Sequence, residues 1–247
     1  MRLHLCALAA GFAKRLYPLT QTCSKPLLDV GGEPLLTRIV RQFAATGKVH
    51  AVSVVHNTKF AGDYVRWRAA QPAAPPIALV DDGAADEAQA LGAVRDLRLL
   101  LATAAHDPGD GYVIAGGDNV FDFDLRPLLF EFARVQRPLL VLRDVGAPVP
   151  GRYSEAVVDA AGRVTSLREK PPDPRSPLSA ICLYFVPRDL PARIDEYLAA
   201  GGDGDAPGHF FAWLVQRTDV RGMRFTGRWF DIGSADTLAA ARRAFGG

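Results

Sequence analysis

Short apolar runs alternate with segments of helical spacing along the first half of the chain, and this alternation limits the fold more than any other feature. The apolar runs have the length of single buried strands, and in the segments between them apolar residues recur as on one face of a helix. Strand alternating with helix is typical of a parallel, doubly wound sheet covered by helices. The predicted strands span 3–10, 49–56, 77–82 and 111–117, and the helical segments span 35–46, 60–70 and 91–105.

The second half of the chain has less helix and more turns. PLLVLRDV, SEAVVDAAGRVTSL and SAICLYFVP indicate strands joined by Pro- and Gly-rich turns, which favours antiparallel additions to the sheet, and PPDPRSP between them indicates a stiff loop. Near the end, GHFFAWLVQRTD has helical spacing, MRFTGRWFDIG returns to strand, and SADTLAAARRAF closes as a helix with Ser234 as N-cap. We therefore expect a three-layer α/β/α fold with a mixed, mainly parallel sheet.

Composition narrows the class of partner. The chain has 247 residues, enough to bury a sizeable core, and its 29 basic and 27 acidic residues are spread without a basic run, so nucleic acid is not an expected partner. Cys6, Cys23 and Cys182 show neither disulfide nor zinc spacing, which favours a reducing, cytoplasmic location. The apolar start is too short to span a membrane, so we expect no membrane association.

The turn after the first predicted strand has the features of a phosphate-binding loop. Ala9, Ala10 and Gly11 carry no bulky side chain, so backbone N–H groups can approach an anion closely. Arg15 adds a planar cationic fork and Lys25 a mobile point charge, a pair suited to a triphosphate. The alternative is a surface loop with two solvated cations, because an isolated glycine turn is a weak signal.

Five segments, the first of which contains that loop, give it a context. LAAGFAKRLYPLT (8–20) and KPLLDVGGEPLL (25–36) are followed by AGGDN (115–119), REKP (168–171) and WFDIGS (229–234). Their content and order resemble the signature of the sugar-1-phosphate nucleotidyltransferases, the nucleoside-diphosphate-sugar pyrophosphorylases that include glucose-1-phosphate thymidylyltransferases. The resemblance covers nearly the whole chain. It implies one Rossmann-like nucleotidyltransferase domain over 1–247, with a nucleotide-binding half at 1–120 and a sugar-phosphate-binding half at 121–247.

The resemblance also implies an activity. A nucleotidyl group would pass from a nucleoside triphosphate to a sugar 1-phosphate, with pyrophosphate leaving and Mg²⁺ as cofactor. The attacking phosphate oxygen is already ionised, so the protein's task is to hold two anions in line and stabilise their charge. Three alternatives stay open: transfer to a non-sugar phosphate such as a cyclitol phosphate or phosphocholine, a non-catalytic sugar-nucleotide-binding subunit, and a glycosyltransferase-like domain.

Five residues are expected to handle phosphate and metal. Arg15 and Lys25 would stabilise the triphosphate, and the resemblance makes Lys170 the candidate for gripping the acceptor phosphate. Asp118 ends an apolar strand, where open α/β sheets place ligands, and with Asp231 it would hold Mg²⁺, which takes one or two carboxylates. Taken singly, each aspartate is more typical of a turn or a cap.

Four other residues are expected to contact the substrates. Glu169 would accept hydrogen bonds from sugar hydroxyls, and Asn119 would bind a hydroxyl as donor or acceptor. By resemblance, Gly92 would lie against the nucleobase and Glu87 would read it, with Gln89 as a rival. A carboxylate would suit guanine, whereas an amide would suit thymine or uracil.

Several positions depart from the family pattern. Lys14 replaces the usual Thr, and it would either join the triphosphate site or point to solvent. Cys182 stands where many relatives have a Gly, and Ser154 and Glu155 replace a Tyr-Gly pair. These changes argue against plain glucose 1-phosphate as the sugar.

Other features lie outside the expected site or stay undetermined. We place Asp122 and Asp124 outside it, as loop and helix-start residues. The sequence leaves the oligomeric state open, a homo-oligomer included. We expect no regulation or trimer formation through a C-terminal β-helix, which many relatives carry and this sequence lacks.

Overall fold

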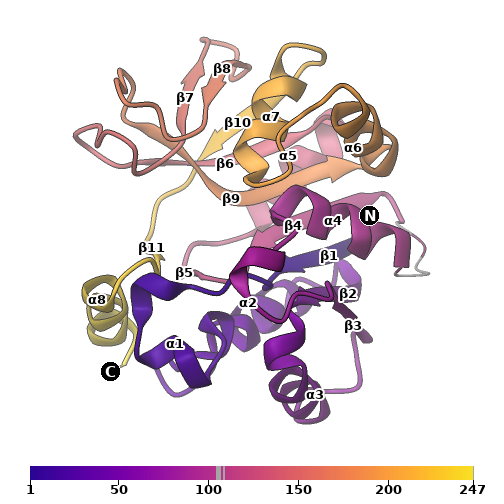
Figure 1. Cartoon of the computed structure of the whole chain (residues 1–247). Coiled ribbons are helices and arrows are strands. Elements are labelled where there is room, and N and C mark those ends of the chain that lie inside the picture. Colours follow the sequence, from indigo (N-terminus) through magenta and orange to yellow (C-terminus); the bar gives the residue numbers. More distant parts are fainter. Residues whose placement is uncertain (104–106, 108, 247) are drawn as a thin grey trace.

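The computed structural model describes residues 1–103, 107 and 109–246, and its centre is a seven-stranded sheet (Figure 1). The strand order is β10-β6-β9-β4-β1-β2-β3. Within this sheet β9 runs antiparallel to both of its neighbours, whereas every other neighbouring pair is parallel. The predicted mixed, mainly parallel sheet is therefore confirmed. Its strands are β1 (Leu3–Leu8), β2 (Val49–His56), β3 (Ile77–Asp81), β4 (Gly111–Gly116), β6 (Leu139–Asp144), β9 (Leu178–Pro187) and β10 (Arg221–Arg224).

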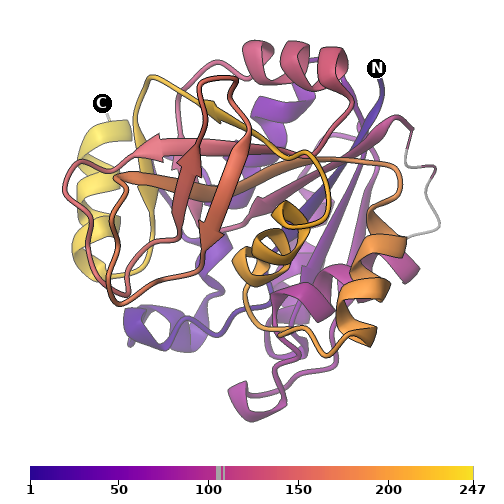
Figure 2. The same ribbon diagram turned by 90° about the horizontal axis from the view of Figure 1, so that it is seen from above.

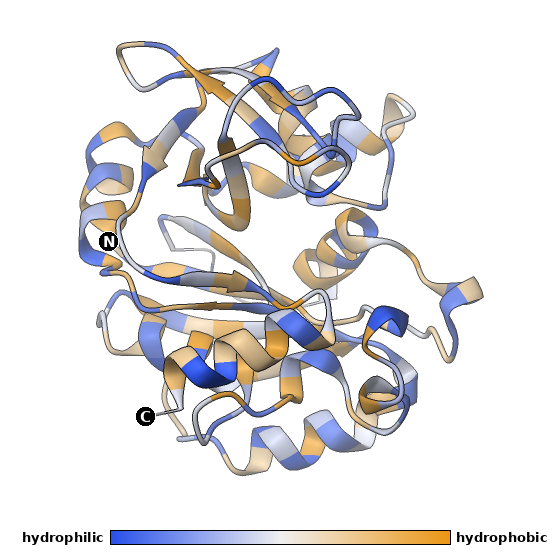
Figure 3. Cartoon of the chain, turned by 90° about the vertical axis from the view of Figure 1, so that its left-hand side faces the viewer, coloured by the Kyte–Doolittle hydropathy of each residue, from blue (hydrophilic) through white to orange (hydrophobic). Residues whose placement is uncertain are grey.

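Helices cover both faces of the sheet, which makes three layers (Figures 1 and 2). Side chains of β1 alternate between the faces: Leu3 and Leu5 belong to one hydrophobic cluster and Cys6 to the other, because successive residues of a strand point to opposite sides. Figure 3 shows the helices striped with hydrophobic and hydrophilic residues, as expected where one face packs on a sheet. One face carries α2 (Leu35–Ala44), α3 (Ala61–Ala69) and α5 (Arg126–Val135), and the other carries α4 (Ala93–Thr103), α6 (Leu190–Ala199) and α7 (Pro207–Val215).

Two small sheets and a C-terminal helix complete the fold. β5 (Asn119–Phe121) pairs with β11 (Trp229–Asp231), and β7 (Glu155–Val158) pairs with β8 (Val164–Arg168), both antiparallel. After β11, helix α8 (Ala235–Phe245) returns to the N-terminal part of the chain (Figure 1), where it contributes to a third hydrophobic cluster. The last strand and helix thus lie beside the predicted nucleotide-binding half. The remaining elements are short helices: α1 (Leu19–Thr22), η1 (Lys14–Leu16), η2 (Lys25–Leu27), η3 (Thr58–Phe60) and η4 (Glu87–Gln89).

The sequence-based prediction of elements needs three corrections. Helices α5 and α6 were not predicted, because Pro127 and Pro191 resemble turn signals although proline is tolerated in the first turn of a helix. The run 223–233 is not one strand: it holds the end of β10 and all of β11, which belong to different sheets. The helix predicted to begin at Leu91 starts at Ala93, and its last two predicted residues, 104 and 105, lie outside the described residues.

The described residues contain no helix that combines the length and apolar character needed to cross a membrane. The stretch 171–177 forms a loop without regular secondary structure, as predicted.

Helix α8 begins with the predicted cap, and its stability depends on it. Ser234 accepts a hydrogen bond from the backbone N–H of Thr237, whose hydroxyl in turn accepts one from the Ser234 N–H. We expect Ser234→Ala to lower the free energy of unfolding by about 1 kcal/mol, because the backbone N–H of Thr237 loses its partner. Urea denaturation followed by circular dichroism measures the loss. Ser234→Asp keeps a capping oxygen and should lose much less, so an equal loss in both variants would contradict this role.

Candidate active site

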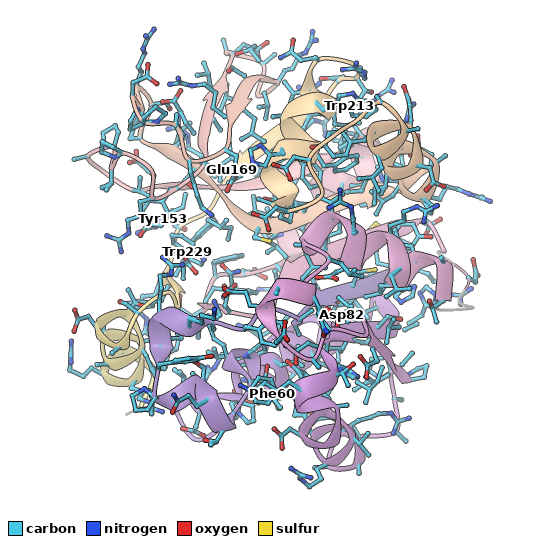
Figure 4. All side chains as sticks on the ribbon, in the orientation of Figure 1. Phe60, Asp82, Tyr153, Glu169, Trp213 and Trp229 are labelled. Atoms are coloured by element: carbon cyan, nitrogen blue, oxygen red, sulfur yellow. The ribbon has the colours of Figure 1, made fainter. Side chains whose placement is uncertain are left out.

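A cavity of about 460 Å³ opens where β1 and β4 end, at the carboxyl edge of the parallel strands. Figure 4 shows residues from both parts of the chain around it: Glu169 lies above the level of Tyr153 and Trp229, and Asp82 lies in the lower part. The structure brings together all but one of the predicted site residues on the cavity wall. Those on the wall are Ala9, Ala10, Gly11, Lys25, Glu87, Gly92, Asp118, Asn119, Glu169, Lys170 and Asp231.

The loop after β1 is fixed by neighbouring elements and leaves room for a ligand. The Ala9 N–H donates to the Val55 carbonyl at 3.0 Å, and the Asn57 side chain donates to the Ala10 carbonyl at 2.7 Å. Gly11 is exposed, and a β-carbon built on it would meet no heavy atom within 4 Å. The loop thus combines a rigid backbone with open space at its glycine, as a phosphate loop requires.

Lys25 and Asp118 form a close ion pair on the cavity wall. The distance from Lys25 Nζ to Asp118 Oδ2 is 2.6 Å, and the two side chains are 15% and 29% exposed. Gly117 allows this approach, since a β-carbon there would lie 2.9 Å from both the Leu8 carbonyl oxygen and Pro26 Cγ. Gly117 of AGGDN is therefore needed where the turn after β4 passes close to Leu8 and Pro26.

Asp231 lies beside Asp118 because their strands pair. In the antiparallel pair β5·β11, Asp231 stands opposite Asn119, and the Ile232 N–H donates to the Asp118 carbonyl at 3.1 Å. Burial, together with the negative charge of Asp118, raises the pKa of Asp231 to about 6, although nearby cations oppose the rise. Among the described residues no three acidic, histidine or cysteine side chains gather as a metal cluster, so these two carboxylates are the candidate pair.

Three cations surround this carboxylate pair. Lys25, Arg15 and Lys170 each lower the pKa of Asp231 through their charge, which shows that all three lie within electrostatic reach. Arg15 is the predicted residue that does not line the cavity, but a β-carbon built on Gly233 would lie 3.7 Å from its Nη2 and 3.9 Å from Asp231 Oδ2. The five residues predicted to handle phosphate and metal are therefore gathered in one place.

Lys170 has an unusual backbone conformation. Its φ is +41°, in the left-handed region that non-glycine residues seldom adopt and that is often found at functional sites. Its side chain is half-exposed, and its Nζ lies 3.5 Å from Glu169 Oε1. A half-exposed ammonium group within electrostatic reach of Asp231 fits the role predicted for Lys170.

The loop that carries Glu169 and Lys170 is anchored by a buried carboxylate. Glu155 accepts hydrogen bonds from the Arg168 guanidinium at 2.8 Å and from the backbone N–H groups of Ser176 (3.1 Å) and Arg175. Burial raises the pKa of Glu155, but these hydrogen bonds outweigh it and hold the pKa below its usual value. Glu155, which departs from the family pattern, thus stiffens this loop.

Glu169 itself is 12% exposed and lies over the start of α7. A β-carbon at Gly208 would collide with its carboxylate, so the sequence needs a glycine there. Its predicted role in binding sugar hydroxyls stays a prediction.

Asn119 is buried and its amide is already engaged. Its Oδ1 accepts from the indole N–H of Trp229 at 2.6 Å, and its Nδ2 donates to the Gly116 carbonyl (3.3 Å) and to Asp118 Oδ1 (3.2 Å). This geometry makes Asn119 a residue that orients Asp118, and the predicted contact with a substrate hydroxyl stays a prediction.

The structure explains Gly92 without a ligand. Gly92 has φ +91°, and a β-carbon would lie 2.5 Å from the Gly204 carbonyl oxygen. The Ala93 N–H donates to the Asp205 carbonyl at 2.6 Å, so the 204–205 loop closes over the start of α4. Contact of Gly92 with a nucleobase stays a prediction.

The two predicted base readers both contact other residues of the protein, and of the two only Glu87 lines the cavity. Glu87 pairs with Lys14, and both side chains are more than half exposed. Gln89 accepts a hydrogen bond from the Ala85 N–H at 2.8 Å. Of the two alternatives for Lys14, the structure favours a side chain that points to solvent over one in the triphosphate site. Base reading by Glu87 or Gln89 stays a prediction.

Sequence reasoning missed Asp96 and Asp82, two buried acids on the cavity wall. Asp96 is 7% exposed, and its Oδ1 is fully buried and has no hydrogen-bond partner among the described residues. Burial, with a smaller contribution from the charge of Asp82, raises the pKa of Asp96 to about 7. The available signal was an aspartate on the apolar face of the predicted helix, beside the buried Val94 and Leu97.

Cys182 forms part of the cavity floor. It has φ +50°, and its Sγ would lie 3.2 Å from a β-carbon on Gly116. Burial, reinforced by the charges of Asp118, Glu169 and Asp231, raises the pKa of the thiol. A neutral thiol therefore takes up the space that a glycine would leave open.

Asp122 and Asp124 are not on the cavity wall. Asp122 binds Arg228 at 2.6 Å, and Asp124 accepts from the N–H of Arg126, the first residue of α5. Their predicted roles as loop and helix-start residues are confirmed.

Comparison with known proteins agrees with this geometry. The nucleotidyl transferase family model matches residues 6–245. The chain is 24% identical over 231 residues to the bifunctional protein GlmU of Methanocaldococcus jannaschii, covering 92% of this chain and 50% of that protein. It is 27% identical over 245 residues to a glucose-1-phosphate thymidylyltransferase of Streptomyces antibioticus, covering 95% of this chain and 64% of that protein. A UDP-glucose pyrophosphorylase structure with UDP-glucose superposes with a TM-score of 0.82 at 16% identity, covering 99% of this chain and 98% of that one.

The chain therefore belongs to the nucleotidyl transferase family, as the resemblance of its motifs predicted. It spans about half the length of the GlmU relative and less than two thirds of the thymidylyltransferase.

The burial of Asp96 predicts a stability that depends on pH. Its pKa is 3.8 before and about 7 after folding, so the unfolded chain releases this proton first and stability falls as pH rises between these values. Asp96→Asn removes the effect. We expect the variant's stability advantage over the wild type to widen between pH 5 and pH 8, by up to about 3 kcal/mol. Urea titrations at both pH values measure it, and a pH-independent difference would contradict the buried, unpartnered carboxyl.

Proposed function

We propose that the protein transfers a nucleotidyl group from a nucleoside triphosphate to a sugar 1-phosphate or a similar phosphate, releasing pyrophosphate. The observation that carries this proposal is the gathering of Arg15, Lys25 and Lys170 around the Asp118–Asp231 pair. Two polyanions repel each other strongly, and converging cations offset that repulsion. Membership of the nucleotidyl transferase family supports the same reaction class.

The chemistry needs positioning rather than a general base. An ionised oxygen of the acceptor phosphate attacks the α-phosphorus, a new P–O bond forms, and the bond to the β-phosphate oxygen breaks with its electron pair going to pyrophosphate. Lys25 and Arg15 stabilise the negative charge on the triphosphate and the leaving group. Lys170 holds the acceptor phosphate, and its exposed side chain can follow the ligand.

The carboxylates of Asp118 and Asp231 fit a magnesium ion. They supply hard oxygen ligands, and the unfavourable charge of Asp118 on Asp231 is the kind of repulsion that a divalent cation relieves. When bound, Mg²⁺ would neutralise phosphate charge. Asn119, by donating to Asp118 Oδ1, orients that carboxylate, while Lys25 holds the other oxygen.

The acceptor end of the cavity favours a substrate other than plain glucose 1-phosphate. Cys182 fills space on the floor near Glu169, and Tyr153 and Trp229 stand at the wall with ring centres 5.9 Å apart. An aromatic wall beside a carboxylate also suits a non-sugar phosphate, so cyclitol phosphates and phosphocholine belong in the test.

Pyrophosphate release tests the proposal. ATP, CTP, GTP, UTP and dTTP are each combined with sugar 1-phosphates, inositol phosphates and phosphocholine in the presence of Mg²⁺. We expect release with at least one triphosphate and sugar phosphate together, loss of release with excess EDTA, and recovery when Mg²⁺ is restored. Release that occurs only when the acceptor is a non-sugar phosphate would favour nucleotidyl transfer to such an acceptor. Nucleotide binding without release from any pair would indicate a non-catalytic subunit.

Lys25 gives a sharper test of the site. We expect Lys25→Ala to lower turnover about 100-fold or more, because the triphosphate loses a preorganised cation. Lys48→Ala is the matched control: Lys48 is exposed, lies directly before β2 and does not line the cavity, so this variant should keep wild-type turnover. Turnover is measured with the best substrate pair, and circular dichroism checks folding. Near-normal rates in Lys25→Ala would overturn the assignment of this cation.

A further inference from the structure

Glu155 is a buried acid near the cavity that has no role in the proposed phosphate chemistry. Its side chain is 4% exposed, and it stands opposite Arg168 in the antiparallel pair β7·β8. Glu155 does not line the cavity, but Glu169 and Lys170, the two residues that follow Arg168, both do. A buried carboxylate is costly unless hydrogen bonds and an opposite charge compensate it, so its partners indicate its role.

The two oxygens of Glu155 hold the two ends of the loop 168–176. Oε1 accepts hydrogen bonds from Nε and Nη2 of Arg168 at 3.1 and 2.8 Å, where the chain leaves β8. Oε2 accepts from the backbone N–H groups of Arg175 and Ser176, the latter at 3.1 Å, shortly before the chain enters β9. One side chain therefore joins the start of the loop to its end.

The composition of the loop makes this carboxylate hard to replace. The stretch 171–177 contains four prolines, which carry no backbone N–H. Of its three other residues, Arg175 and Ser176 both donate their N–H groups to Glu155. The stretch forms no regular secondary structure, so a side chain takes the place of the ladder of hydrogen bonds that a strand or helix would provide.

The backbone of Lys170 needs such support. Its φ of +41° is one that a non-glycine residue keeps only where the surrounding structure imposes it. The Lys170 side chain is 55% exposed, so its own packing gives little restraint. The neighbouring Pro171 carbonyl accepts from the Gly151 N–H at 3.0 Å. The segment that carries Glu155 thus holds the backbone on both sides of Lys170.

We propose that Glu155 is a positioning residue for the acceptor phosphate: by joining the two ends of the loop 168–176, it sets Glu169 and Lys170 in place on the cavity wall. The inference rests on the proposed function, in which Lys170 holds the acceptor phosphate. Lys25 and Asp118 belong to other segments and are joined by their own ion pair. Loss of the Glu155 contacts should therefore weaken acceptor binding and leave binding of the nucleoside triphosphate unchanged.

Steady-state kinetics separate the two substrates. Pyrophosphate release is measured with Mg²⁺ and the fastest wild-type pair among the five nucleoside triphosphates and the sugar 1-phosphates, inositol phosphates and phosphocholine, each substrate being varied in turn. We expect Glu155→Gln to raise the KM for the acceptor about 10-fold or more, because an amide nitrogen cannot accept and one end of the loop loses hydrogen bonds to a charged group. The KM for the triphosphate should change by less than about twofold. An unchanged acceptor KM, or an equal rise in both, would overturn the proposal.

Arg168→Gln tests the same contact from the other side. The Arg168 side chain is 35% exposed, so its replacement demands less of folding than a change at the buried Glu155. This variant should also raise the KM for the acceptor selectively. Glu131→Gln removes a comparable Glu–Arg pair, with Arg134 on the surface of α5, and as the matched control should leave both KM values unchanged. An Arg168→Gln variant with a wild-type acceptor KM would contradict the proposal.

Hydrogen–deuterium exchange gives a readout that does not depend on turnover. The N–H groups of Arg175 and Ser176 should exchange faster in Glu155→Gln than in the wild type, whereas those of β1 should not. Faster exchange with an unchanged acceptor KM would show that Glu155 stiffens the loop without serving the acceptor, and would overturn the proposal.

The wild-type measurements separate this inference from the proposed function. Failure of the wild-type chain to release pyrophosphate from any pair would reject the proposed function, and the acceptor role of Glu155 with it. Release by the wild type, together with variants that alter both KM values equally or neither, would reject the inference alone and keep the nucleotidyl transfer.

Discussion

The antiparallel pairing of β5 with β11 is the interaction on which the candidate active site depends. It joins segments more than a hundred residues apart and sets Asp231 beside Asp118 through the hydrogen bond from the Ile232 N–H. The indole of Trp229 strengthens the same pairing by donating to Asn119. Helix α8 packs behind β11 and fixes it against the N-terminal part of the chain. Without this return of the C-terminal segment, the cavity would hold only one of the two paired carboxylates.

Charge is distributed unevenly over the cavity wall: cations gather in one part and unpaired acids in another. At one end, three cations surround two carboxylates, one of which has its pKa raised to about 6 by burial and by its neighbour. Asp96 of α4 and Asp82 after β3 are two buried acids on the cavity wall, and in the described part of the chain the charge that acts on Asp96 is that of Asp82, not of a cation. Electrostatics thus favours binding of the anionic part of a ligand beside the three cations.

Glycines make this crowded site sterically feasible. Gly117 lets the turn after β4 approach Leu8 and Pro26, and Gly92 admits the 204–205 loop over the start of α4. Both positions belong to segments that resemble family motifs, so part of each motif reflects backbone packing rather than ligand contact. Cys182 and Lys170 adopt positive φ without being glycine, and both lie on the cavity wall. Strain of this kind persists where the surrounding structure imposes it.

The sequence by itself determined the strands, most of the helices and the motif residues that converge on the cavity, because local periodicity and motif order lie within the chain. The sequence did not indicate helices α5 and α6, because a proline in the first turn of each resembles a turn signal. Only the tertiary structure decided that Lys14 pairs with Glu87 at the rim, that Asn119 is engaged by Trp229, and that Asp96 is buried in the cavity wall. Burial and partner choice depend on contacts between segments far apart in the chain, which a local pattern does not encode.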